Sequence, residues 1–213
     1  MPEPPPPSRA NPPPFRPAKP VVIGILGGVA AGKSAVASAF AAHGLAVVDA
    51  DQEARAVTAE PAVLAELARV LGPELVRDGQ LDRAALAALV FRDGQARSRL
   101  EAITHPRIRD RVLAAVAAAH RQGNSVLLDA PLLLEGGLIA RCNHVVFVAA
   151  ADAVRAARAA TRGWDASELA RREAAQAPLP DKRRAAAFTI DNDGDLATMR
   201  NQVATLLERL AKP

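Results

Sequence analysis

The fold of this chain is decided by one segment, Val21-Val22-Ile23-Gly24-Ile25-Leu26-Gly27-Gly28-Val29-Ala30-Ala31-Gly32-Lys33-Ser34. It begins with a continuous apolar run, which is typical of a strand buried on both faces of a sheet. The residues from Gly27 to Ser34 match the pattern G-x-x-x-x-G-K-[ST] at every fixed position. The small residues that follow, up to Ala42, favour a helix. A strand, a glycine-rich loop and a helix in this order predict a phosphate-binding loop.

A loop of this kind holds a nucleoside triphosphate through backbone N–H groups and the positive end of the following helix. Lys33 is expected against the β- and γ-phosphates, and the Ser34 hydroxyl is expected on Mg²⁺. The residues predicted to bind the nucleotide are Gly28, Val29, Ala30, Ala31, Gly32, Lys33, Ser34 and Ala35. The alternative is a Gly/Ala-rich turn with a surface lysine, and the motif alone does not specify the reaction.

Shorter apolar runs recur along the chain, at residues 45–49, 125–129, 145–149 and, more weakly, 188–190. The stretches between them are rich in Ala and Leu and have helical spacing, as has the terminal stretch 196–210. Strands that alternate with helices imply crossover connections. The sequence therefore predicts an α/β fold with a five-stranded parallel sheet and helices on both faces.

Acidic residues follow two of the predicted strands. Asp49 and Asp51 come after the second strand, and Asp129 ends the third in the manner of a Walker B segment. Ligands of parallel sheets bind beyond the carboxyl ends of the strands. If the strand continues its alternation, Asp49 and Asp51 share one side, where one could activate an acceptor hydroxyl and the other could support Mg²⁺. Solvation of the strand end and capping of the next helix is the alternative, and Asp129 is a possible metal ligand.

The amino-acid composition narrows the partners and the location expected of this protein. The chain is 50% hydrophobic with only 3% aromatic residues and carries a net charge of +4. Because opposite charges are interspersed and no aromatics accompany the arginines, we expect no nucleic-acid partner. The apolar runs are too short for a membrane span, and the single Cys142 agrees with a reducing, cytoplasmic location. Ten of the seventeen prolines lie in residues 1–20, which are predicted to form a disordered or polyproline-like arm.

Short motifs from Val22 to about Leu210 together resemble the dephospho-CoA kinase family. Each is weak alone, but their order is specific. They are the IG-x-x-GG-x-x-x-GKS loop, DAD at 49–51, DG-x-LDR at 78–83, LE-x-I-x-HP at 100–106, PLL-x-E at 131–135, R-x-x-x-R at Arg158 and Arg162, Gln176, and the Asp191-Asn192-x-Gly194 segment.

On the acceptor side, the resemblance implies that Asp51 activates the ribose 3′-hydroxyl of dephospho-CoA. His105 and Pro106 match a segment near the acceptor pocket, and Arg83 belongs to the same helical region. Without the resemblance, His105 is better interpreted as a turn histidine before proline. Arg83 with Asp82 could likewise be an ordinary exposed pair.

On the nucleotide side, Arg158 and Arg162 resemble lid arginines, with Arg158 acting beside Lys33 in catalysis. Four residues apart on a helix, the two arginines would share a face, which suits a clamp on a polyphosphate but also a solvated surface. Asn192 and Gly194 resemble part of an adenine-side loop. The resemblance thus implies transfer of a phosphoryl group from ATP, with Mg²⁺, to dephospho-CoA, in the last step of coenzyme A synthesis.

The resemblance also implies two added parts on a domain spanning 21–213, an acceptor-binding helical insertion at about 55–115 and a lid at about 155–186. Four residues depart from the family pattern: Leu26 replaces Thr, Ala30 replaces Gly, Ala35 replaces Ser or Thr, and Arg155 replaces Gln. Another small-molecule kinase and an inactive nucleotide-binding relative remain alternatives. A GTPase is disfavoured because no N/T-K-x-D motif is present. The sequence does not indicate an oligomeric state.

Overall fold

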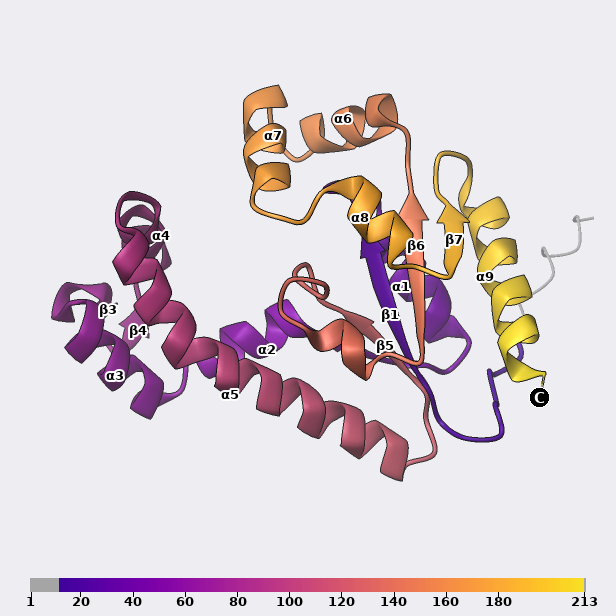
Figure 1. The fold of residues 1–213 in the computed structure, drawn as a ribbon, viewed down its shortest axis with the longest axis horizontal. Helices are drawn as coiled ribbons and strands as arrows, with labels where there is room; N and C mark the ends of the chain where they lie inside the picture. Colours follow the sequence, from indigo (N-terminus) through magenta and orange to yellow (C-terminus); the bar gives the residue numbers. More distant parts are fainter. Residues whose placement is uncertain (1–11, 213) are drawn as a thin grey trace, which may run out of the picture. The chain divides into compact units, whose positions relative to one another are not determined.

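The apolar segment ahead of the glycine-rich loop forms the central strand of a five-stranded sheet in the computed structural model, which describes residues 12–212 (Figure 1). The strands, in the order β2-β5-β1-β6-β7, are β2 (Ala46–Asp49), β5 (Val126–Asp129), β1 (Val22–Gly27), β6 (His144–Ala149) and β7 (Phe188–Asp191). β1 pairs in parallel with β5 and β6, and β6 pairs in parallel with β7. The predicted five-stranded parallel α/β fold is confirmed, and all five predicted strands are present.

The described chain divides into two units. The core unit comprises the described residues up to Val47 and from Ala119 onward, and the inserted unit comprises Val48–Ala118. Helices of the core unit are α1 (Lys33–Ala42), α6 (Asp152–Ala160), α7 (Ala166–Ala174), α8 (Leu179–Arg184) and α9 (Leu196–Ala211), with a 3₁₀ turn η2 (Leu138–Arg141). α1 and α9 contact each other, and α8 packs against β1 (Figure 1).

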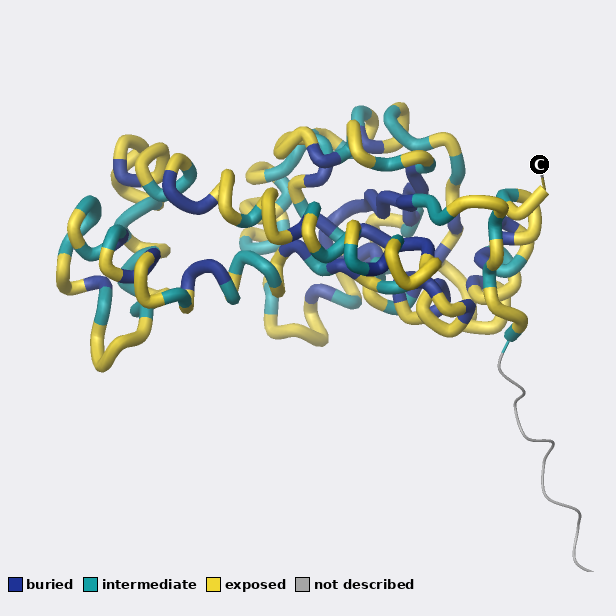
Figure 2. Tube along the Cα trace, turned by 90° about the horizontal axis from the view of Figure 1, so that it is seen from below, coloured by how far each residue is buried: buried dark blue, intermediate teal, exposed yellow. Residues whose placement is uncertain are grey.

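The core of this unit lies between the sheet and the helices α1 and α9. Every residue of β1 is buried, because neighbouring strands cover its edges and helices cover its faces. Phe40 of α1 and Met199 of α9 belong to the same buried cluster as Ile25 and Val148 of the strands. Buried positions, dark blue in Figure 2, include every residue of β1. This rigid centre fixes the position of the loop that follows β1.

The inserted unit contains α2 (Ala50–Val57), α3 (Pro61–Leu71), a 3₁₀ turn η1 (Pro73–Leu75), α4 (Arg83–Arg92) and α5 (Gly94–Arg121). Between them lies a two-stranded antiparallel hairpin, β3 (Val76–Arg77) with β4 (Gln80–Leu81). Its turn is Asp78-Gly79, with φ of 50° and 71°, as a two-residue hairpin turn with positive φ requires. The predicted helical insertion thus also contains a short hairpin, which sequence reasoning missed although the Asp-Gly pair is a recognised hairpin signal.

The predicted proline-rich arm, residues 1–20, is described only from residue 12, and residues 1–11 lie outside the described part. Its described end contacts the core unit. The Phe15 amide donates to the His43 carbonyl at 2.8 Å, and the His43 ring nitrogen Nδ1 lies 2.9 Å from the Pro13 carbonyl. Phe15 also packs against the core cluster. This end of the segment is thus held in place by α1 and the turn that follows it.

Candidate active site

The phosphate-binding loop joins the buried end of β1 to α1, and its backbone conformation explains its glycines. Gly32 precedes the helix with φ of 89°, in the left-handed region. A Cβ added there would lie 2.2 Å from Asn192 Nδ2, so a larger residue would have to displace the Asn192 side chain. Lys33 Nζ donates to the Gly28 carbonyl at 3.3 Å, across the loop. The Ser34 side chain is exposed in the first turn of α1, where the first amides of a helix have no intrahelical acceptor.

Two side chains that the sequence assigned to the nucleotide site hold this loop from outside. Arg158 of α6 donates from Nη1 to the Ala31 carbonyl at 3.1 Å and from Nη2 to the Asn192 carbonyl at 2.7 Å. Asn192, which follows β7 and is buried, donates from Nδ2 to the same Ala31 carbonyl at 2.8 Å. The structure therefore brings Arg158 and Asn192 to the loop, while Gly194 lies in the exposed bend beyond Asn192.

Arg162 lies beyond the end of the helix that carries Arg158. α6 ends at Ala160, and Arg162 lies in the turn beyond it, exposed, with its guanidinium carbon 5.4 Å from the centre of the Trp164 ring. Arg172 of α7 contacts the same ring at 4.0 Å. The assumption that one helix carries both arginines is wrong, because α6 ends two residues before Arg162, and a clamp of the two on a polyphosphate stays a prediction. Trp164 instead organises two arginines at the junction of α6 and α7.

Arg155, one of the four departures from the family pattern, is buried beside the loop. Its guanidinium donates to Asp152 at 2.8 Å, to the Val29 carbonyl at 3.4 Å, and to Glu173 of α7. Burial opposes its charge, but the hydrogen bonds to Asp152 and Glu173 outweigh that effect and raise the pKa of Arg155. Arg155 thus links α6, α7 and the loop.

Ala30, another departure, has φ of 59°. An alanine in this region carries a steric cost that glycine avoids. The positive φ of Ala30 is therefore a strained conformation for alanine, at a position where the family pattern has glycine. Ala35 is half-buried in α1, and its amide donates to the Gly32 carbonyl at 3.0 Å.

Asp49 and Asp51 belong to different elements. β2 ends at Asp49, whose carboxylate accepts hydrogen bonds from the amides of Asp51 at 2.8 Å and Gln52 at 3.2 Å, and so caps α2. Asp51 lies in the first turn of that helix. The assumption that strand alternation places both carboxylates on one side is wrong, and the capping alternative describes Asp49 correctly. Asp129 ends β5, level with Ile25 of the neighbouring β1.

The remaining acceptor-side residues lie on helices of the inserted unit. Arg83 begins α4 and donates to the Thr58 hydroxyl at 3.2 Å. Asp82 does not pair with it but caps α4 through the Ala85 amide. His105 is exposed in the middle of α5, followed by Pro106 within the same helix, so the interpretation of His105 as a turn residue is wrong.

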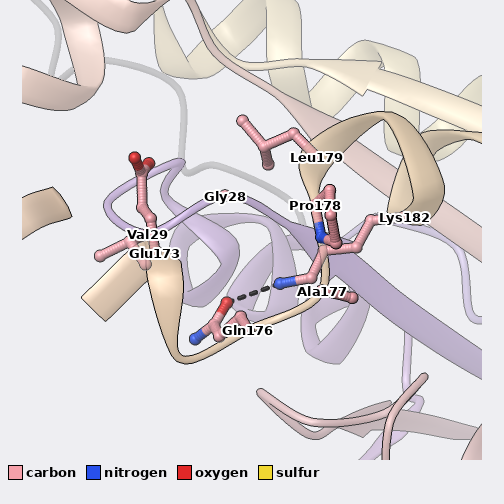
Figure 3. Close-up of a pocket in the computed structure, with 8 residues that line it drawn as sticks. All are labelled: Gly28, Val29, Glu173, Gln176, Ala177, Pro178, Leu179 and Lys182. Carbon is pink, nitrogen blue, oxygen red and sulfur yellow. Dashed lines mark hydrogen bonds between the residues drawn. The ribbon is translucent and has the colours of Figure 1, made fainter. Parts of the chain in front are cut away.

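A cavity of about 200 Å³ opens beside the start of the loop, and sequence reasoning missed it (Figure 3). It is lined by Gly28, Val29, Glu173, Gln176, Ala177, Pro178, Leu179 and Lys182. Lys182 of α8 is among the most buried side chains, 1% exposed. One signal in the sequence could have pointed to Lys182. The chain has only four lysines and many arginines, and this lysine lies in an arginine-rich segment.

This fold and loop define the class of the protein: it is a P-loop kinase. The sequence model described as Dephospho-CoA kinase matches residues 21–198. The dephospho-CoA kinase of Deinococcus radiodurans is 44% identical over 202 residues, covering 94% of this chain and 97% of that one. The dephospho-CoA kinase of Anaeromyxobacter dehalogenans is also 44% identical, over 89% of this chain and 92% of its own length.

Solved structures share the fold of this chain. The crystal structure of TT1252 from Thermus thermophilus has a TM-score of 0.79 and 35% identity, covering 91% of this chain and all of that one. The dephospho-CoA kinase from Campylobacter jejuni shares the fold, with a TM-score of 0.70 at 22% identity. The chain belongs to the dephospho-CoA kinase family, as the sequence motifs predicted. Within residues 12–212, no helix combines the length and apolar character that crossing a bilayer requires.

Proposed function

We propose that this chain carries out the reaction that names its family, with Asp51 as the general base and Lys33 and Arg158 stabilising the transferred charge. The ribose 3′-oxygen of dephospho-CoA forms a bond to the γ-phosphorus of ATP, and the bond from that phosphorus to the β-phosphate oxygen breaks. The proton of the hydroxyl passes to the Asp51 carboxylate. ADP and CoA are the products.

Nucleotide binding is assigned to the loop, to Asn192, which holds it, and to two exposed residues that the family resemblance implies. The residues are Gly28, Val29, Ala30, Ala31, Gly32, Lys33, Ser34, Ala35, Arg162, Asn192 and Gly194. Arg158 has already one nitrogen on the loop carbonyl of Ala31, so its guanidinium is positioned without further side-chain ordering.

Magnesium fits the residues present. Among residues 12–212 no group of three or more His, Cys, Asp or Glu side chains could hold a metal ion. Mg²⁺ typically needs only one or two protein ligands beside substrate phosphates and water. The exposed Ser34 hydroxyl and the Asp129 carboxylate are the proposed ligands, and the ion would neutralise charge on the phosphate oxygens.

The acceptor is assigned to the inserted unit, with Asp51, Arg83, His105 and Pro106 as its binding residues. The described boundaries of this unit, Val48–Ala118, enclose the segment 55–115 proposed for acceptor binding. The proposed lid, residues 155–186, covers most of α6 and all of α7 and α8, and its closure would exclude water from the γ-phosphoryl. A cytoplasmic location completes the proposal.

The observation that carries the proposal is the left-handed loop at Gly32, held by Arg158 and Asn192 at the carboxyl end of the central strand. The test is to follow ADP and CoA together from Mg-ATP and dephospho-CoA. Lys33→Ala is expected to lower kcat by about 10²- to 10³-fold, and Asp51→Asn by about 10²- to 10⁴-fold.

Asp49→Asn is the matched control for Asp51, because asparagine caps helices as well as aspartate does. Asp49→Asn removes a carboxylate close to Asp51 in the sequence, and this variant should keep a near-normal rate of CoA formation. Equal rates for wild type and Lys33→Ala would refute the assignment of the loop. ADP without CoA would point to another acceptor, and bound ATP without either product would indicate an inactive relative.

A further inference from the structure

Lys182 is a buried cation whose hydrogen bond, among residues 12–212, goes to a neutral group. Its side chain is 1% exposed, and its Nζ donates to the neutral amide oxygen of Gln176 at 2.6 Å (Figure 3). None of the ion pairs found among residues 12–212 involves Lys182. A buried ammonium group is costly unless an opposite charge or several hydrogen bonds compensate it. The position of Lys182 therefore calls for a further ligand.

The surroundings of Lys182 indicate the kind of ligand. It lines the cavity that is walled by Gly28 and Val29, the first residues of the phosphate-binding loop. Burial lowers the pKa of Lys182; Glu135 and Glu173 act to raise it, and the positive charge of Lys33 lowers it further. Two lysines close enough to repel each other at the edge of one loop favour a shared anion.

The presence of lysine rather than arginine at position 182 is also informative. The chain contains only four lysines, against a large excess of arginine, and two of them are Lys33 and Lys182. A lysine is a compact charge that can bind one oxygen in a narrow space, whereas the planar arginine fork needs more room. The cavity beside Val29 is small, about 200 Å³, which suits a single ammonium group and a phosphate oxygen.

We propose that Lys182 is a second phosphate-binding lysine, whose Nζ binds an oxygen of the γ-phosphoryl group of the nucleotide held by Lys33. The proposal rests on the proposed function for the identity of the nucleotide. Binding of the triphosphate places negative charge between two ammonium groups, so that repulsion in the free protein becomes attraction in the complex. Gln176 keeps the Lys182 side chain directed into the cavity until the nucleotide arrives.

The test compares wild type with Lys182→Met, which keeps the length of the side chain and removes its charge. Affinities for Mg-ADP and for the magnesium complex of the non-hydrolysable β,γ-imido analogue of ATP are measured by calorimetry. The analogue is expected to lose roughly tenfold or more in affinity while ADP loses less than threefold, as expected for one lost charge-assisted contact. Turnover should fall by about 10²-fold, with the KM for dephospho-CoA within twofold.

Two variants separate this role from a structural one. Gln176→Ala removes the same hydrogen bond but leaves the charge, and it should keep the preference for the analogue over ADP. Lys212→Met removes an exposed lysine from the chain and should match wild type in every measurement. If Lys182→Met fails to fold, Lys182→Gln replaces it, because glutamine can keep the hydrogen bond to Gln176.

The proposal is overturned if a folded Lys182 variant prefers the analogue over ADP as strongly as wild type does. It is also overturned if the variant loses equal affinity for ADP and for the analogue. The affinity measurements need no acceptor. A wild-type protein that makes no CoA would therefore refute the proposed function, while the response of ADP and analogue binding to Lys182→Met would still decide the role of Lys182.

Discussion

Replacing Ala30 by glycine tests whether the phosphate-binding loop holds backbone strain. Ala30 has φ of 59°, whereas its neighbour Ala31 is not among the non-glycine residues of positive φ within the described part of the chain. Both side chains are buried, at 6% and 1% exposure. Ala30→Gly and Ala31→Gly therefore remove the same buried methyl group and add the same freedom to the unfolded chain, and they differ in strain alone.

The magnitudes follow from these three contributions. Loss of a buried methyl group costs about 0.8 kcal/mol, and the added freedom of glycine costs about 0.5–1 kcal/mol. Ala31→Gly should thus lower the free energy of unfolding by roughly 1.3–1.8 kcal/mol. Ala30→Gly has the same costs but recovers about 1–2 kcal/mol of left-handed strain, so its net effect should be close to zero.

Thermal unfolding of the nucleotide-free protein, followed by circular dichroism, measures the difference. For a chain of this size, 1 kcal/mol corresponds to roughly 2–4 °C in Tm, so the glycine variant at position 30 should melt roughly 2–8 °C above the variant at position 31. Equal Tm values for the two variants would refute the strain argument. A lower Tm for Ala30→Gly would show that the methyl group contributes more than the strain costs.

Three further outcomes are expected. Asp49→Ala should lower the free energy of unfolding by about 1 kcal/mol in urea titrations, because it removes the cap of α2; Asp49→Asn should not. Gly32→Ala should abolish detectable nucleotide binding in calorimetry, since its Cβ would lie 2.2 Å from Asn192 Nδ2, and a variant with normal affinity would contradict this. Burial raises the pKa of Cys142 from 9.0 to about 11, so at pH 8 its reaction with a disulfide reagent should be about a hundredfold slower than in urea-unfolded protein. The same shift means that only the unfolded state ionises between pH 9 and 11, and stability should fall as the pH rises through that range.

The sheet and the loop could be predicted from the sequence because local signals and tertiary structure agree there. The apolar run before Gly27 has no alternation, which fits only a strand covered on both faces, and β1 is buried throughout. The loop pattern requires a left-handed residue before the helix, and Gly32 supplies it. At such positions the residue type and the backbone conformation determine each other.

The sequence-based predictions were wrong where the position of two side chains depended on the residue at which a strand or helix ends. The grouping of Asp49 with Asp51 required β2 to continue for two more residues, but the carboxylate of Asp49 begins α2 instead. The placement of Arg158 and Arg162 on one helix required α6 to continue for two more residues, but α6 ends at Ala160. Spacing along the chain predicts shared faces only within one element, and element boundaries depend on hydrogen bonds that spacing does not encode.

The contacts between the loop and three basic side chains could not be predicted from the sequence for a different reason. Arg155 and Arg158 of α6 donate to the loop carbonyls of Val29 and Ala31, and Lys182 of α8 reaches the cavity beside Val29. Each contact joins residues more than a hundred positions apart, so no local pattern records it. Carbonyl oxygens are weaker acceptors for a cation than phosphate oxygens. A polyphosphate in the loop therefore offers stronger partners to the side chains that already lie beside it.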